Sequence, residues 1–284
     1  MKLNETGLSS RKKWKDAGYQ LPEYDRRKTA EATRKAPFWI HFGAGNIFRA
    51  FQANVVQKLL NSKDLDRGLI AVEGYDYEII EKMYHPHDGL SILVTLKADG
   101  NIEKTVVGSV VESLVLNSDD EAQFGRLKEI FSSDTLQMAT FTITEKGYCL
   151  TDGRGIPFAD VAEDMQNGPE KPSSYIGKLA SLLHTRYLSG GTPIAMVSMD
   201  NCSHNGDKLR DAVTAFAETW EENGKAKKGF LSYVEDPAKV SFPWTMIDKI
   251  TPRPDPSVEA LLNKDGIENL DPVITSKKTY VLLL

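Results

Sequence analysis

The residues whose types and spacing carry the most specific chemistry lie between 41 and 50. A short apolar run, 37–42, ends in a glycine-rich turn, and apolar residues then recur at helical spacing. In such a turn one glycine permits a tight bend, the next lets the backbone approach a pyrophosphate, and the first helical amides attract its charge. The pattern predicts a dinucleotide site; the alternative is a purely structural strand–turn–helix junction. The residues predicted to bind the cofactor here are Gly43, Ala44, Gly45, Asn46, Ile47 and Phe48.

The pattern departs from the usual fingerprint in one place, because Phe48 stands where a third small residue is expected. A carboxylate at the end of the second strand is the other hallmark of such sites, since it binds the adenosine ribose and repels a 2′-phosphate. Glu73 ends the apolar run 69–72, and Asp76 is the reserve candidate. Either carboxylate favours NAD over NADP, although an acidic residue at a strand end is often only a solvated turn residue.

Two more strand ends carry polar side chains. Thr144 and Glu145 follow one apolar run, and Asp200 and Asn201 follow another. In open α/β sheets ligands bind at the carboxyl ends of the strands, so we expect Thr144, Glu145 and Asn201 to face a bound cofactor. The Asn201 amide can donate to a carbonyl oxygen or a developing alkoxide. Alternatively, Asn201 is only the N-cap of the next helix.

These side chains need a layered α/β framework to position them. The alternation of strands and helices predicts a mostly parallel, doubly wound, Rossmann-like sheet with an added β-hairpin. The strands are expected at 37–42, 68–72, 91–97, 105–116, 136–144 and 192–199, the helices after Gly45 and at 119–131, 174–189 and 206–222, and a loop at 151–173.

The N-terminal residues 1–36 are treated as a separate arm, and residues 37–284 as one Rossmann-like dinucleotide-binding domain. The arm holds ten Lys and Arg against five acidic residues, so it carries +5 while the whole chain carries −5. Such an arm is expected to be a solvated segment, although it could contact an anionic ligand. The apolar end Tyr280–Leu284 is typical of a chain that was cut or that continues into another domain; the alternative is a last buried strand.

Composition excludes several classes of protein. Apolar residues make up 40% and charged residues 26% of the chain, and no apolar run approaches the ~20 residues that span a bilayer. No membrane partner, and a cytoplasmic location, are therefore expected. The net negative charge argues against nucleic acid as a partner. Cys149 and Cys202 are too few for a dedicated zinc site, and we interpret the His85–His87 pair as a loop, so no metal is predicted.

Five segments in order along the chain resemble the mannitol dehydrogenase and mannonate oxidoreductase family, the polyol-specific long-chain dehydrogenases. The glycine turn resembles the coenzyme-binding signature of that family. Three departures stand out: Met199 replaces the usual Cys, Ile247 replaces Val, and Lys249 replaces Arg, whose planar contact a lysine cannot reproduce. The segments are LPEYDR at 21–26, HFGAGNIFRAF at 41–51, TITEKGY at 142–148, SMDNCSHNG at 198–206 and VSFPWTMIDKITP at 240–252.

The resemblance implies an oxidoreductase that uses NAD and interconverts a secondary alcohol and a ketone on an open-chain polyol or sugar acid, with a couple such as mannonate and fructuronate slightly favoured over mannitol and fructose. It also implies that Asn201 is an oxyanion donor. The general-base lysine of the family lies in a helical C-terminal domain, whose K-x-x-x-x-N-x-x-H type motif is absent from these 284 residues. No lysine of this chain is therefore assigned to catalysis.

Two alternatives remain open at this point. The chain could be a nucleotide-binding module without catalytic activity. It could also use its sheet edge for a different ligand, such as a sugar nucleotide.

Overall fold

The computed structural model describes residues 1–97, 99–248, 256–267 and 273–276. The chain divides into two compact units, which we describe separately. Unit 1 comprises the described residues of 1–35, 44–113 and 248–276, and unit 2 comprises residues 36–43 and 114–247. The predicted arm at 1–36 and the predicted domain at 37–284 stay a prediction.

The larger sheet has the strand order β6-β3-β2-β7-β8-β9. Within unit 2, β2, β7, β8 and β9 are all parallel. Phe42 of β2 lies opposite Phe141 of β7, which lies opposite Ser198 of β8, so the three strands end side by side. The mostly parallel sheet predicted from the sequence is confirmed here. The six strands, in sheet order, are Val110–Val115, Leu69–Glu73, Trp39–Phe42, Met138–Phe141, Ile194–Ser198 and Val240–Ser241.

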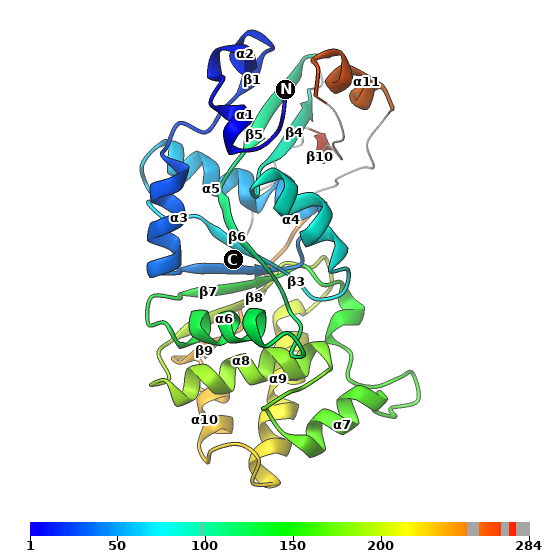
Figure 1. Cartoon of the computed structure of the whole chain (residues 1–284). Coiled ribbons are helices and arrows are strands. Elements are labelled where there is room, and N and C mark those ends of the chain that lie inside the picture. Colours follow the sequence, from blue (N-terminus) through cyan, green and yellow to red (C-terminus); the bar gives the residue numbers. More distant parts are fainter. Residues whose placement is uncertain (98, 249–255, 268–272, 277–284) are drawn as a thin grey trace. The chain divides into compact units, whose positions relative to one another are not determined.

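In unit 2, helices follow the strands along the chain, and α9 packs against β8 while α10 packs against β9 (Figure 1). Helix α8 is apolar on most of its surface and buries eleven of its fourteen residues, so it forms the centre of the unit. Helix α9 buries a stripe that runs from Leu209 to Trp220 at helical spacing. The helical segments of this unit are α6 (Glu121–Ser132), η3 (Glu145–Tyr148), α7 (Ala159–Asn167), α8 (Tyr175–Leu188), α9 (Asn205–Glu222) and α10 (Phe230–Glu235).

Arg186 of α8 ties the entrances of two strands to this core. Its side chain is 1% exposed and donates five hydrogen bonds of 2.8–2.9 Å, all to backbone carbonyl oxygens. Two acceptors, Leu136 and Pro193, lie just before β7 and β8. The guanidinium thereby satisfies carbonyl groups that would otherwise be buried without a donor.

Unit 1 contains a smaller sheet with the strand order β1-β5-β4-β10. Its antiparallel pair β4–β5 is the hairpin predicted from the sequence, with Ser91 opposite Val107 and Leu96 opposite Ile102. The elements of this unit, apart from β3 and β6, are α1 (Glu5–Leu8), α2 (Arg11–Asp16), β1 (Tyr19–Gln20), α3 (Arg26–Lys35), α4 (Asn46–Ala50), α5 (Gln52–Asn61), η1 (Ile80–Tyr84), η2 (His85–His87), β4 (Ser91–Leu96), β5 (Ile102–Val107), α11 (Pro256–Lys264) and β10 (Val273–Ser276).

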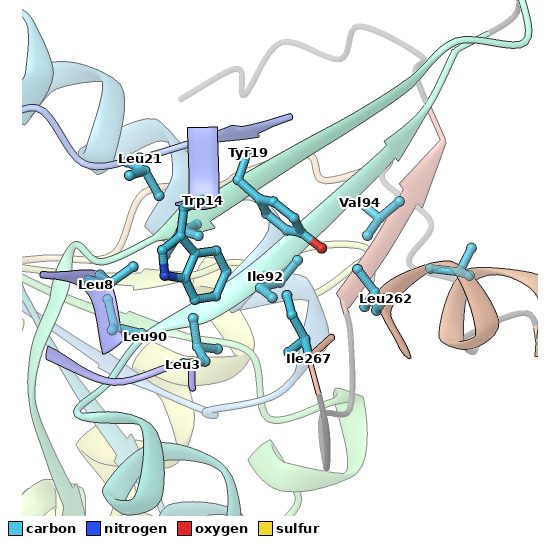
Figure 2. Packing of buried hydrophobic residues seen from close by; sticks show 12 residues of the cluster. Leu3, Leu8, Trp14, Tyr19, Leu21, Leu90, Ile92, Val94, Leu262 and Ile267 are labelled. Atoms are coloured by element: carbon cyan, nitrogen blue, oxygen red, sulfur yellow. The ribbon is translucent and has the colours of Figure 1, made fainter. Parts of the chain in front are cut away.

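The expectation that residues 1–36 form a solvated segment is wrong. These residues form three helices and a short strand, and Trp14 of α2 is fully buried. Figure 2 shows Trp14 and Tyr19 packed among side chains from β4 and from residues 258–267. This core was not predicted, because most of the side chains that pack against Trp14 come from residues 90–106 and 258–267, far away in the sequence.

Three other expectations need correction. The loop predicted at 151–173 contains helix α7, which buries Val161 and ends at Gly168 with a positive φ. The strand predicted at 105–116 is divided into β5 and β6 at Gly108 and Ser109. The helix after Gly45 is interrupted at Phe51, which separates α4 from α5. Within the described residues, no helix has the length and apolarity to cross a membrane.

Candidate functional site

In unit 2, the chain leaves β2 through a glycine that no other residue can replace without displacing its neighbours. Gly43 has a φ of +108°, and a Cβ atom there would lie 2.2 Å from the carbonyl oxygen of Thr142. The close approach follows from the parallel pairing of β2 with β7. The first glycine of the turn thus allows the tight bend of the backbone that the sequence predicted.

His41 lies beneath this turn in a chain of side-chain hydrogen bonds. The indole N–H of Trp39 donates to Thr140 Oγ1 (2.8 Å), which contacts His41 Nδ1 (2.6 Å). His41 Nε2 contacts Thr142 Oγ1 (3.0 Å), and that hydroxyl donates to the Gly43 carbonyl oxygen (3.2 Å). Because the last hydroxyl proton goes to a carbonyl, Nε2 must carry the imidazole proton and Nδ1 must accept. Burial lowers the pKa of His41 from 6.5 to about 3, so the ring is neutral.

In unit 1, helix α4 begins with Gly45 as its N-cap. Gly45 has an ordinary extended conformation (φ −78°, ψ −171°), and a Cβ atom there would meet nothing within 4 Å. Because the N-cap is a glycine, it has no side chain that could cap the first amides of α4. A turn with open space above the glycine at the start of a helix is the arrangement that accepts a pyrophosphate. Phe48, at the third fingerprint position, is fully buried instead.

Glu73 and Tyr84 hold the peptide groups of Ala44 in this same unit. Glu73, at the end of β3, is 6% exposed and its Oε2 accepts the Ala44 N–H at 3.0 Å. The Tyr84 hydroxyl donates to the Ala44 carbonyl oxygen at 2.9 Å. Glu73 Oε1 accepts the N–H groups of Gly74 and Tyr75, both at 2.9 Å. The Asp76 N–H also donates to Oε1, at 3.4 Å, so the Glu73 carboxylate has four backbone donors, whereas the Asp76 residue is exposed.

The exit of β7 in unit 2 is organised by Asp200, which follows β8. Asp200 Oδ2 accepts the Ile143 N–H at 3.0 Å, and Oδ1 accepts the Thr144 N–H at 2.9 Å. The Tyr148 hydroxyl donates to Oδ2 at 2.5 Å, so Ser198 Oγ, 2.8 Å away, must donate to that hydroxyl. Burial, and next the charge of Asp200, raise the pKa of Tyr148 well above 10, so this side chain stays a neutral donor.

Asn205 completes the framework from the other side. It is 1% exposed, and its amide donates to the carbonyl oxygens of Asp200 (3.0 Å) and Thr245 (2.9 Å). Its own oxygen accepts the Gly206 and Thr245 N–H groups at 2.8 and 3.1 Å. Asn205 thus links the β8 exit, the start of α9 and the segment after β9.

Asn201 is exposed within this framework. The alternative role as a helix N-cap is wrong, because α9 begins at Asn205 and its N-cap is His204. Thr144 and Glu145 are also exposed, and Lys208 of α9 forms an ion pair of 3.3 Å with Glu145. Lys249, the departure noted in the sequence, lies outside the described residues, as does the apolar end Tyr280–Leu284.

The structure therefore links some predicted residues and leaves others separate. In unit 1, the Ala44 N–H is hydrogen-bonded to Glu73. In unit 2, the Thr144 N–H is hydrogen-bonded to Asp200, which precedes Asn201 in the chain. Sequence reasoning missed the organising roles of Asp200, Tyr148 and Asn205. Asp200 and Asn205 lie within the segment 198–206 that resembles the family. Their closeness to Asn201 in the sequence was the one signal that they could shape its surroundings.

Comparison with known proteins decides which family this arrangement represents. Residues 38–272 match the model of the mannitol dehydrogenase Rossmann domain, which is more than half of the chain. The chain belongs to the mannitol dehydrogenase family. This match confirms the resemblance and the Rossmann-like α/β fold predicted from the sequence.

Individual relatives agree with this assignment. The chain is 43% identical over 281 residues to a D-mannonate oxidoreductase of Thermotoga maritima, covering 99% of this chain and 52% of that protein. It is 28% identical to a mannitol 2-dehydrogenase of Cereibacter sphaeroides, covering 89% of this chain and 50% of that protein. Mannitol 2-dehydrogenase of Pseudomonas fluorescens, solved with NAD and D-mannitol, superposes with a TM-score of 0.78 at 27% identity and covers 97% of this chain and 53% of that one. The chain thus spans about half the length of these relatives.

Proposed function

We propose that this chain is the nucleotide-binding part of an NAD-dependent oxidoreductase that interconverts a secondary alcohol and a ketone on an open-chain polyol or sugar acid. The observation that carries the proposal is the Gly45 turn, which has open space above an extended glycine at the start of α4. The family of the chain, and the NAD in the related mannitol 2-dehydrogenase, support the same cofactor. A cytoplasmic location stays a prediction.

The residues of the turn fit a dinucleotide. The Asn46 and Ile47 amides start a helix and have no carbonyl acceptor within it, so they are suited to bind phosphate oxygens. The peptide of Ala44 is held at both ends by Glu73 and Tyr84, which keeps the turn in shape before any ligand arrives. Since Glu73 already accepts hydrogen bonds from four backbone N–H groups, we propose that it shares the ribose with the exposed Asp76.

The chemistry of the site divides between the cofactor and the chain. NAD, when bound, would supply the hydride chemistry, and the residues of this chain would orient the substrate and balance its charge. The Asn201 amide is the proposed donor to the substrate oxygen, which carries negative charge as an alkoxide forms. Thr144 and Glu145, which follow β7, are likewise proposed to contact the cofactor.

The substrate class is proposed from the relatives. The D-mannonate oxidoreductase is 43% identical to this chain, and the mannitol 2-dehydrogenase of Cereibacter sphaeroides is 28% identical. A sugar acid such as D-mannonate is therefore preferred over a neutral polyol in this proposal.

Binding of NADH by the Gly45→Val variant tests the cofactor assignment. The variant should fold normally, because Gly45 has an ordinary φ and free space, yet its side chain would occupy the approach of the pyrophosphate. We expect isothermal titration calorimetry to show an NADH affinity at least ~10-fold below that of the unaltered chain.

The matched control is Gly153→Val, which makes the same replacement at an exposed glycine with equally open space and no positive φ. It should bind NADH as the unaltered chain does. If the folded Gly45→Val protein bound NADH as tightly as the unaltered chain does, the proposal that the pyrophosphate binds at this turn would be wrong.

A further inference from the structure

Thr144 has a backbone conformation that is almost exclusive to glycine. Its φ is 65° and its ψ is 159°, and a β-branched side chain is especially unfavourable there. Asp88 and His204, which also have positive φ, instead adopt the milder left-handed helical conformation. Strain of this kind persists only where surrounding contacts determine the geometry.

Asp200 supplies those contacts. Its two carboxylate oxygens accept the consecutive N–H groups of Ile143 and Thr144 at 3.0 and 2.9 Å. A third donor, the Tyr148 hydroxyl, fixes the orientation of the carboxylate at 2.5 Å. On the other side of Thr144, its carbonyl oxygen accepts the Gly147 N–H at 3.0 Å. The strained residue is thus held from both of its peptide groups.

Asp200 is itself fixed, since Asn205 donates to its carbonyl oxygen. The Asp200 side chain therefore holds the two peptide groups that precede Ile143 and Thr144, and the Asp200 carbonyl belongs to the peptide group that precedes Asn201. Glu145 directly follows Thr144 in the chain. The side chains of Thr144, Glu145 and Asn201 are exposed at the strand ends. We propose that Asp200 is a positioning residue, which holds Thr144 in its strained conformation so that Thr144, Glu145 and Asn201 face the cofactor in a preset arrangement. This inference rests on the proposed binding of NAD.

Asp164 offers a matched comparison. It is 3% exposed and accepts the N–H groups of Ser173 (2.8 Å) and Ser174 (2.7 Å), much as Asp200 does. However, Ser174 has an ordinary φ of −70°, and the cluster lies at the start of α8 rather than at the strand ends. Asp164 is thus a carboxylate with a structural role only.

The test compares Asp200→Asn with Asp164→Asn in the full chain. An amide can accept at only one atom, so Asp200→Asn should release the Thr144 peptide. We expect NADH affinity, measured on folded protein by calorimetry, to fall at least ~10-fold in Asp200→Asn and to stay unchanged in Asp164→Asn. Hydrogen exchange of the 142–148 amides should accelerate only in Asp200→Asn.

Thr144→Gly separates positioning from general structural support. Because glycine adopts this φ and ψ without strain, the double variant Asp200→Asn/Thr144→Gly should bind NADH more tightly than Asp200→Asn alone. In the Asp164→Asn background the same glycine should bring no gain. The inference would be overturned if the two substitutions changed the NADH affinity independently of each other. It would also be overturned if Asp200→Asn bound NADH as tightly as the unaltered chain does. If the unaltered chain bound no NADH, the proposed function would fail, and hydrogen exchange would decide by itself whether Asp200 holds Thr144.

Discussion

Two neighbouring strands of unit 2 end in backbone conformations with positive φ, yet they reach them with different residues. The chain leaves β2 through Gly43 at +108° and leaves β7 through Thr144 at +65°. The strands are paired in parallel, with Phe42 opposite Phe141, so both exits lie at the same edge. One exit uses the residue best suited to the geometry, and the other uses one of the least suited.

The surroundings of the two residues explain the difference. At Gly43 the Thr142 carbonyl leaves no room for any side chain, so glycine is required by space as well as by φ. Thr144 is exposed, so its side chain has room and its strain is balanced by the Asp200 carboxylate. A non-glycine residue with a strained backbone at an exposed strand end is typical of a functional position, whereas a glycine in a crowded turn is a requirement of the fold.

The comparison predicts its largest effect at Gly43. Gly43→Ala should lower the free energy of unfolding by at least about 3 kcal/mol, because the new methyl group overlaps the Thr142 carbonyl and alanine disfavours this φ. Urea unfolding followed by circular dichroism measures this. A loss below 1 kcal/mol, of the order expected for an ordinary surface position, would mean that the turn can open without cost.

The next effect concerns pH and His41, beneath the Gly43 turn. Its pKa is about 3 in the folded chain against 6.5 when unfolded, so the unfolded state binds the proton first. The stability that neutral His41 contributes is present above pH 6.5 and is lost as the pH falls from 6.5 toward 3. Between pH 7.5 and 5 this loss is about 2 kcal/mol.

Urea unfolding at pH 7.5 and at pH 5 checks the prediction. Between these pH values, the free energy of unfolding of His41→Gln should fall by about 2 kcal/mol less than that of the unaltered chain. His85→Gln, at an exposed histidine, should keep the original pH dependence. If the stability of all three proteins depended on pH in the same way, His41 would not be the source of the loss of stability in acid.

The smallest effect is expected at Thr144, and its sign is the informative part. Thr144→Gly removes strain of about 1–3 kcal/mol and adds a backbone entropy cost of about 0.5–1 kcal/mol. We therefore expect the variant to be about 1 kcal/mol more stable in thermal or urea unfolding. Thr105→Gly, within β5, should be less stable instead. Destabilisation by Thr144→Gly would show that Thr144 is not strained.

Elements defined by local patterns could be predicted from the sequence. The glycine turn, the hairpin and the strands β7 and β8 have apolar runs bounded by turn residues, and the structure has them within a few residues of the expected bounds. The open space at Gly45 follows from the same pattern. Such features depend on neighbouring residues, which a sequence displays directly.

Features that depend on distant residues could not be predicted. The contact between Asp200 and Thr144 joins residues 56 positions apart, and the contact between Glu73 and Ala44 joins residues 29 apart. Glu73 looked like a ribose ligand because strand-end acids often are, while its backbone partners became visible only in the structure. The N-terminal core around Trp14 was hidden for the same reason, since most of its partners lie at 90–106 and 258–267.

That core has a consequence for the order in which the chain folds during synthesis. Trp14 and Leu8 pack in one cluster with Val258, Leu262 and Ile267, which emerge from the ribosome some 250 residues later. Residues 114–247 form most of unit 2 and are contiguous, so they can fold while the last partners of Trp14 are still being made. The first residues synthesised are therefore among the last to be fully buried, and their apolar side chains stay exposed to water for longer than those in the middle of the chain.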